Sequence, residues 1–104
     1  MKRTGFKMKL LEGYKDEYIK RHREIWPSVV ELLRQQGISN YSIFLDEQTN
    51  DLYAYQEQSG ASSSQDLGDI EIIKEWWNYM KDIMETNLDN SPVTIPLQEV
   101  FHLE

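Results

Sequence analysis

The sequence contains no cysteine among its 104 residues. This absence excludes disulfides, thiol nucleophiles, iron–sulfur clusters and zinc sites with cysteine ligands. Histidine is also scarce, because only His22 and His102 occur and neither has the neighbouring ligands of a typical metal site. The sequence carries no glycine-rich phosphate-binding loop and no GxSxG nucleophile motif.

Basic residues and long hydrophobic runs are in short supply too. There are 18 acidic residues and 11 basic ones, which gives a net charge of −7. A nucleic-acid binder gathers Lys and Arg on one face, whereas the densest basic group here, within residues 15–23, is interrupted by Glu17 and is typical of a solvated helix face. No stretch approaches the ~20 apolar residues of a membrane span, and the N-terminal residues do not resemble a signal peptide. We therefore expect a cytoplasmic protein that binds neither nucleic acid nor membranes.

The length and the aromatic content favour a single small domain over residues 1–104. Hydrophobic residues make up 39% of the chain, which is slightly low for a free-standing monomer, and aromatic residues at 12% supply much of the apolar area. A domain of this kind often completes its burial by pairing with a second copy of itself.

Apolar periodicity predicts the order strand, helix, two strands, helix, strand. The first strand covers residues 5–11, and a helix follows Gly13 and ends at Gly37. Pro27 lacks the N–H that would continue the helix, so we expect a kink or a short break near residues 24–26, with Pro27 at the start of a second helical segment. The remaining elements are a hairpin over 40–57, a helix over 69–85 and a final strand over 97–103. Residues 59–66, SGASSSQD, are predicted to form a mobile surface loop without a core anchor.

This order is that of an α+β, ferredoxin-like βαββαβ fold, in which two helices cover one face of a single sheet. The other face would carry alternating aromatic residues that a monomer leaves exposed. The candidates are Phe44, Phe101, either Phe6 or Tyr41, and either Tyr53 or Tyr55. A second sheet from a symmetry mate would cover them, which predicts a homodimer in the form of a dimeric α/β barrel.

Tyr18 and His22 are the first candidates for a functional site. They are spaced i, i+4 and project from the same side of the first helix. A histidine with a pKa near ~6.5 can give or take a proton at neutral pH, and the tyrosine hydroxyl can orient a ligand or the imidazole. A single histidine on an apolar face is more often a core residue with satisfied polar atoms, so the spacing leaves both interpretations open.

Trp76 and Trp77 are the second candidates, since adjacent residues on a helix project about 100° apart. Both cannot point straight into the core, so one would pack inward while the other lines an edge or a pocket. An indole plate suits the C–H-rich face of a sugar ring, particularly that of a deoxysugar. Alternatively, both indoles simply pack the helix onto the sheet. Tyr41, near the start of the hairpin, is equally ambiguous by itself.

The sequence resembles the L-rhamnose mutarotase family over nearly its whole length, and three blocks carry the resemblance. They are EYIKRHREIWPSVVELLRQQGISNYSIFLD (residues 17–46), EWWNYMKDIM (75–84) and DNSPVTIPLQEVFHL (89–103). The resemblance is weakest over residues 59–74, where family members usually carry a more charged, helix-forming run that often includes an aromatic residue.

The resemblance implies a cytoplasmic, homodimeric enzyme without metal or organic cofactor that interconverts the α and β anomers of L-rhamnose. By position, the proton donor of the family falls on His22. The sugar-binding residues fall on Tyr18, Tyr41, Trp76 and Trp77. The base that takes the anomeric proton stays open between Asp89, Tyr18 and a bound water.

Two other functions fit the same residues. One is a cofactor-free monooxygenase on the same barrel scaffold, because a fold does not fix a function. The other is a non-catalytic sugar-binding module in which His22 is passive. Anomer exchange without oxygen uptake distinguishes a mutarotase from both alternatives.

Overall fold

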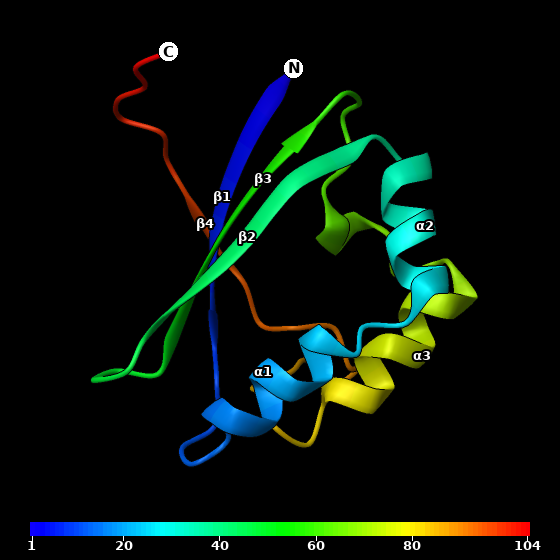
Figure 1. Cartoon of the computed structure of the whole chain (residues 1–104), viewed down its shortest axis with the longest axis vertical. Helices are drawn as coiled ribbons and strands as arrows, with labels where there is room; N and C mark the ends of the chain where they lie inside the picture. Colours follow the sequence, from blue (N-terminus) through cyan, green and yellow to red (C-terminus); the bar gives the residue numbers. More distant parts are fainter.

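The computed structural model describes all 104 residues and has an α+β architecture (Figure 1). Its strands are β1 (Lys2–Lys9), β2 (Ile38–Asp46), β3 (Asp51–Gln58) and β4 (Ile95–Leu97). Its helices are α1 (Lys15–Arg23), α2 (Pro27–Gln35) and α3 (Glu71–Met80), together with a short 3-10 helix, η1 (Ser64–Asp66). None of these helices has both the length and the apolar character needed to cross a membrane.

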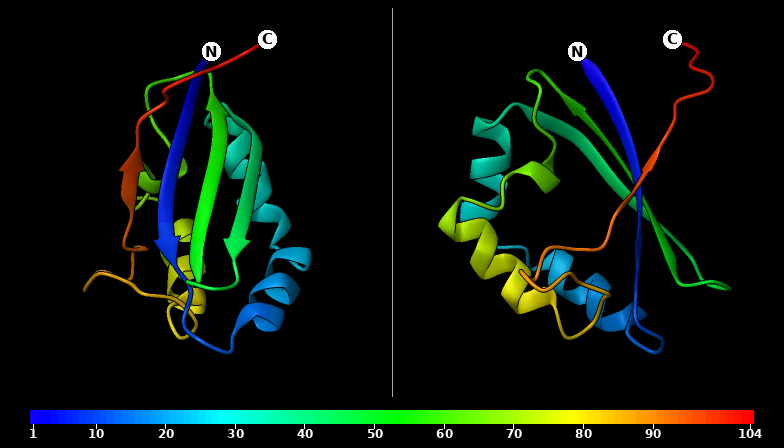
Figure 2. Two further views of the ribbon diagram at one scale, coloured as in Figure 1. Left: turned by 90° about the vertical axis from the view of Figure 1, so that its left-hand side faces the viewer. Right: turned by 180° about the vertical axis from the view of Figure 1, so that it is seen from behind.

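The strands form one antiparallel sheet in the order β2-β3-β1-β4. All three α-helices lie on one face of the sheet, and the other face has no helix on it (Figure 2). The buried core therefore fills the space between the sheet and the helices. This arrangement confirms the predicted class and the predicted covering of a single face.

The predicted break in the first helical segment is confirmed. Helix α1 ends at Arg23, and α2 begins at Pro27 itself, because proline is tolerated at the first position of a helix, where its missing N–H has no partner to lose. Gly37 follows α2 with φ +82°, a left-handed conformation that glycine adopts without steric cost. The break places His22 in the last turn of α1.

Strand pairing decides which aromatic residues face the helices. Phe6 is buried beneath them and lies edge-on to Tyr41, with the ring centroids 6.4 Å apart. Phe44 pairs with Tyr53 on the outer face, where both are exposed, and Tyr55 lies two residues further along the same side of β3. Phe6 and Tyr41 therefore both belong to the inner face, so the prediction that one of them lies on the outer face is wrong.

Two predicted elements are shorter than expected. Helix α3 ends at Met80, and residues 81–83 form a turn instead of continuing the helix. The last strand contains only Ile95–Leu97, because its one partner is β1 and the pairing stops at Gly5 and Leu97. Residues 98–104 have no regular structure, and Phe101 is 77% exposed. This C-terminal segment extends away from the helices (Figure 1).

The segment over residues 59–66 has an anchor in the core, so that part of the prediction is wrong. Ser63 caps η1, with its hydroxyl accepting from the Gln65 N–H, and Asp66 completes a reciprocal capping box. Ser64 is only 6% exposed, and its N–H donates to the side chain of Gln56 at 2.8 Å. Small polar residues serve here as caps and as buried hydrogen-bonding partners.

Candidate active site

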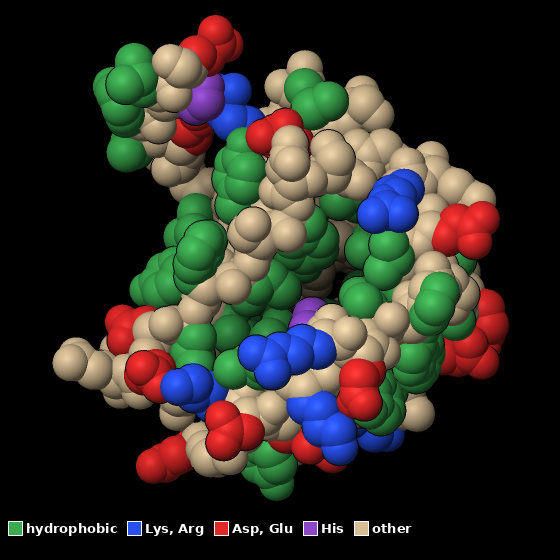
Figure 3. All heavy atoms as spheres, in the orientation of Figure 1, with side chains coloured by type: hydrophobic (Ala, Val, Ile, Leu, Met, Phe, Trp, Pro, Cys, Tyr) green, Lys and Arg blue, Asp and Glu red, His purple; other side chains and the backbone are tan.

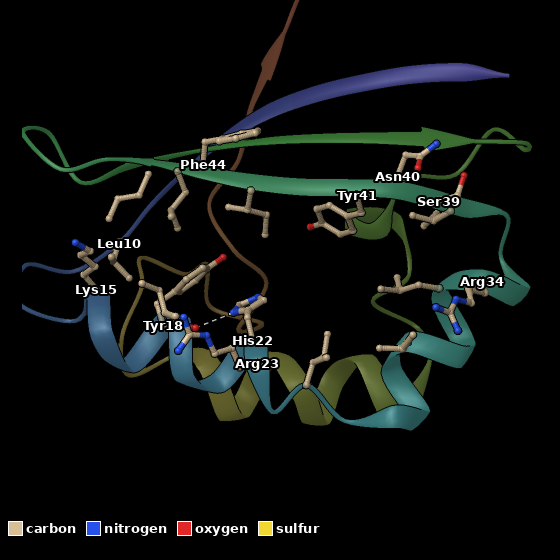
Figure 4. Close-up of a pocket in the computed structure, with 18 of the residues that line it drawn as sticks. Leu10, Lys15, Tyr18, His22, Arg23, Arg34, Ser39, Asn40, Tyr41 and Phe44 are labelled. Atoms are coloured by element: carbon tan, nitrogen blue, oxygen red, sulfur yellow. Dashed lines mark hydrogen bonds between the residues drawn. The ribbon is translucent and has the colours of Figure 1, made fainter.

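A cavity of about 820 Å³ lies between the sheet and helices α1 and α2 (Figure 4). Tyr18 and His22 project into it from α1, and Tyr41 projects into it from β2. Figure 3 shows the surface hollowed between the sheet and the helices, with a histidine ring inside the hollow. Most residues of the wall are apolar, so the few polar groups decide what the cavity can bind.

A second, inner cavity of about 70 Å³ adjoins the first. The same Tyr18, His22 and Tyr41 also line it, and Trp76 and Trp77 of α3 close its far side. The structure therefore brings all five predicted site residues together, three at the junction of the two cavities and two behind it.

The His22 ring is held in one tautomer by its own helix. Its Nδ1 lies 3.1 Å from the carbonyl oxygen of Tyr18, one helical turn earlier. A carbonyl can only accept, so Nδ1 carries the hydrogen and the lone pair of the neutral ring is on Nε2. Burial lowers the pKa of His22 below the usual 6.5, although the hydrogen bond to Tyr18 opposes this shift. The ring is therefore neutral at neutral pH, with Nε2 as a proton acceptor.

Aromatic rings fix the His22 imidazole on two sides. The Tyr18 ring stacks on it, with centroids 4.2 Å apart and planes inclined by 28°. Trp76 meets it edge-on at 5.6 Å. Tyr18 is only 7% exposed, and burial raises the pKa of its hydroxyl far above the ordinary value, with a smaller contribution from Tyr41. The Tyr18 phenol is thus a neutral hydrogen-bond donor, which argues against its service as a base.

A β-bulge turns Tyr41 toward the cavity. The pairing of β2 with β3 shifts register between Ser39 and Ser42, and Asn40 takes a positive φ of 47°. One extra residue in a strand reverses the alternation of side chains beyond it. Ile38 faces the core before the bulge, and Tyr41 faces it afterwards although the two are three residues apart. Burial also raises the pKa of the Tyr41 hydroxyl, which stays protonated at neutral pH.

Both tryptophans are packed in the core, each 8% exposed, as in the alternative that both indoles pack the helix onto the sheet. Trp76 packs edge-on against Trp26, with centroids 5.1 Å apart. Trp77 instead lies on Gly68, where an added Cβ would come within 2.8 Å of the indole. Different neighbours enclose α3 on two adjacent sides, so both indoles are buried. Their contact with a sugar stays a prediction.

Arg21 ties α1 to α3 beside the site. Its guanidinium donates to Glu17 at 2.8 Å, to Asp82 at 2.8 Å and to the carbonyl of Tyr79 at 2.7 Å. These charge-assisted bonds hold the helix end that carries His22 against α3. Arg21 thus fixes the position of the end of α1. Both carboxylates already accept hydrogen bonds from Arg21.

The candidate base Asp89 lines neither cavity. It lies in an exposed turn, where it accepts a hydrogen bond from the N–H of Ser91 and where Ser91 lowers the pKa of its carboxyl. No three His, Asp or Glu side chains of the chain are grouped to hold a metal ion.

Sequence reasoning missed a polar group at the inner cavity. Gln56 is fully buried on β3, and it bonds to Ser64, which in turn lies 3.4 Å from the Tyr41 hydroxyl. Gln65 lies beside them and lines the inner cavity. The available clue was Gln56 itself, which continues the inward alternation of Leu52 and Ala54 and therefore has to find a partner inside.

The comparisons with known proteins agree with the blocks quoted above. A sequence model described as L-rhamnose mutarotase matches residues 3–103. The chain belongs to the L-rhamnose mutarotase family.

Several relatives carry the same name. An L-rhamnose mutarotase of Bacteroides thetaiotaomicron is 57% identical over 104 residues, which is 100% of both chains. One of Listeria monocytogenes is 47% identical over 99% of both chains. The crystal structure of an L-rhamnose mutarotase from Formosa agariphila matches this fold with a TM-score of 0.93 and 52% identity, covering 100% of both chains. The mutarotase family fold is thus preserved along the full chain.

The packing of Trp77 on Gly68 can be tested with one methyl group. Gly68→Ala places a Cβ 2.8 Å from the indole and forces it to move. We expect a loss of unfolding free energy of about 1–3 kcal/mol, the usual cost of overpacking, measured by urea denaturation. Gly60→Ala is the matched control, because its Cβ would meet nothing within 4 Å. Equal stability of the two variants would contradict the packing described here.

Proposed function

We propose that this chain catalyses the interconversion of the α and β anomers of L-rhamnose. The observation that carries this proposal is the cavity, where a neutral imidazole with a free Nε2 stands between two protonated phenols. Full-length similarity to proteins named L-rhamnose mutarotase supplies the substrate. The same names favour this activity over the monooxygenase and the passive sugar-binding module.

The reaction requires little from the protein. The bond between C1 and the ring oxygen breaks, the anomeric hydroxyl loses its proton, and the ring oxygen gains one. The product is an open-chain aldehyde, which turns about the C1–C2 bond and closes on its other face. No electrons are transferred to an acceptor and no covalent enzyme intermediate forms, so acid–base catalysis and orientation suffice.

His22 would serve as base first and as acid second. In the neutral ring Nε2 has only a lone pair to offer, so it takes the proton of the anomeric hydroxyl. The anomeric and ring oxygens are bonded to the same carbon, so the imidazolium can return that proton to the ring oxygen with a small shift. The proton-donor role expected of His22 then follows from its first acting as base. This proposal needs no separate carboxylate, in keeping with the position of Asp89 outside both cavities.

Tyr18 and Tyr41 would bind the sugar as neutral donors, because burial keeps both hydroxyls protonated. Trp76 and Trp77 would form the apolar back wall behind them. The cytoplasmic location expected from the sequence stays a prediction.

The activity and the role of His22 can be tested together by saturation-transfer NMR of the anomeric protons of L-rhamnose. The native protein should accelerate anomer exchange, and His22→Asn should lower the catalysed rate on the order of 100-fold, the usual scale for a general acid–base group. The melting temperature should change little. His102→Asn, on the exposed C-terminal segment, is the control and should behave like the native protein. A variant at position 22 that loses stability but exchanges anomers at the native rate would mean that His22 is only a core residue.

The order of the two proton transfers predicts a pH dependence. Catalysis starts from the neutral ring, and burial lowers the pKa of His22 below 6.5. The catalysed rate should therefore be flat around neutral pH and should fall at acid pH, with a midpoint below 6.5. Exchange rates measured across this range, after subtraction of the spontaneous rate, give the profile. A rate that rises as the ring becomes protonated would show that His22 starts as the acid.

We also propose that the domain is ferredoxin-like and forms a homodimer through the helix-free face of its sheet. The antiparallel order β2-β3-β1-β4 supports the first part. The second is supported by exposed apolar residues on that face, including Phe44 (67% exposed) and Ile95 (52%). Such a patch is unusual on a stable monomer, and a two-fold axis would bury it against its own copy as a dimeric α/β barrel.

Light scattering should therefore return a mass of about twice 12.4 kDa. Phe44→Glu places a charge on the face of the proposed contact and should shift the mass toward the monomer. Gln35→Glu, on the exposed side of α2, adds the same charge elsewhere and should leave the mass unchanged. A native protein that is monomeric at micromolar concentration and still active would refute this assembly.

A further inference from the structure

Four polar side chains form a connected group at the inner end of the site: Tyr41, Gln56, Ser64 and Gln65. The Gln56 amide is oriented without ambiguity, because its Oε1 accepts from the Ser64 N–H at 2.8 Å. Its Nε2 therefore donates to the Ser64 hydroxyl, at 2.9 Å. The Gln65 Nε2 lies 3.2 Å from the same hydroxyl oxygen.

The directions of these bonds follow from the number of hydrogens available. The Ser64 oxygen accepts from two amide groups, so its single hydrogen points to the Tyr41 oxygen, 3.4 Å away. Tyr41 thereby accepts on that side and has its own hydrogen free to donate into the cavity. Gln56 and Ser64 do not reach the ligand in this scheme, and they act as positioning residues for Tyr41.

Gln65 differs from the other members of the group. With its Nε2 directed at Ser64, its Oε1 is the only buried side-chain oxygen or nitrogen of the chain without a hydrogen-bond partner in the protein. A buried acceptor left unpaired costs about 1–3 kcal/mol, so such an atom is retained where a ligand completes it. Gln65 lines the same inner cavity as His22 and the tryptophans. That cavity, at about 70 Å³, admits a hydroxyl group but not a sugar ring.

We propose that Gln65 is a substrate-binding residue that accepts a hydrogen bond, through Oε1, from a hydroxyl of the bound sugar. Beside it, Tyr41 donates a hydrogen bond to the sugar. This adjacent acceptor and donor can bind one sugar hydroxyl or two hydroxyls on neighbouring carbons. The two protein groups would therefore select the configuration of the carbon atoms that carry those hydroxyls. The inference rests on the proposed mutarotase function.

The test is Gln65→Met, which keeps the length of the side chain and removes both the Oε1 acceptor and the Nε2 donor to Ser64. We expect the dissociation constant for L-rhamnose, measured by calorimetry, to rise about tenfold, the weight of one hydrogen bond to a buried group. The melting temperature of the ligand-free protein should change little, since the removal of an unpaired acceptor offsets the loss of the hydrogen bond to Ser64. Gln48→Met, in the exposed turn after β2, is the matched control and should bind normally.

Monodeoxy analogues of L-rhamnose separate a direct contact from a structural effect. The native protein should discriminate against the analogues lacking the hydroxyl at C2, C3 or C4, and the penalty of Gln65→Met should vanish for one of them. The proposal would be overturned if Gln65→Met weakened the binding of all analogues equally. It would also be overturned if the weaker binding came with a lower melting temperature in both Gln65→Met and Gln65→Ala. Unchanged affinity in Gln65→Met would overturn it as well. If the native protein fails to exchange L-rhamnose anomers at all, it is the proposed function that fails, and that experiment does not involve Gln65.

Discussion

The site depends on Pro27, which cannot supply the N–H that would continue the first helix. Without this interruption, α1 and α2 would form one straight rod, and a single apolar stripe would face the sheet along its length. The break instead lets α1 and α2 take different directions, with Trp26 between them. Trp26 packs against Trp76 of α3, and Trp76 packs against His22. One missing hydrogen-bond donor thus leads through two aromatic contacts to the orientation of the proposed catalytic ring.

The electrostatics of the site come from burial rather than from charged partners. Arg21 bonds to Glu17 and Asp82, and no charged group contributes to the shift in the pKa of His22. Desolvation then acts in opposite directions on the two kinds of group. It lowers the pKa of His22, which keeps the imidazole neutral, and it raises the pKa of Tyr18 and Tyr41, which keeps their hydroxyls protonated. One apolar environment therefore prepares an acceptor and two donors at neutral pH, which is a suitable set for an uncharged sugar.

Periodicity predicted the parts of the fold that depend on burial on one side of an element. The strand–helix alternation, the break before Pro27 and the hairpin all follow from local patterns of apolar residues and from proline and glycine. The length of the last strand could not be predicted in this way, because residues 98–103 alternate well and yet have no neighbouring strand within the chain. Alternation of apolar and polar residues indicates that a segment is suited to form a strand. Whether a neighbouring strand is present to pair with it depends on the tertiary or quaternary structure.

The candidate site divides in the same manner. His22 and Tyr18 were found by helical spacing, and the tryptophan pair by composition, but spacing could not reveal that both indoles would be enclosed. Tyr41 depends on a bulge at Asn40, a backbone event that changes the alternation by one residue and leaves only the tolerance of asparagine for a positive φ as a clue. Ser64 and Gln65 could not be identified from the sequence, because a short run of polar residues predicts a loop when its hydrogen-bonding partners are unknown.

Two independent constraints meet at Tyr41. The bulge in β2 sets where its ring points, and the bonded pair of Gln56 and Ser64 sets which way its hydroxyl hydrogen points. The first constraint is backbone geometry within the sheet, while the second comes from side chains of β3 and of η1. Changes at residues 64–65 alone would therefore alter the hydrogen-bonding character of Tyr41 without moving its ring. Because the proposed catalytic imidazole is fixed separately, by its own helix, such changes would alter which sugar is held without altering the proposed proton transfer.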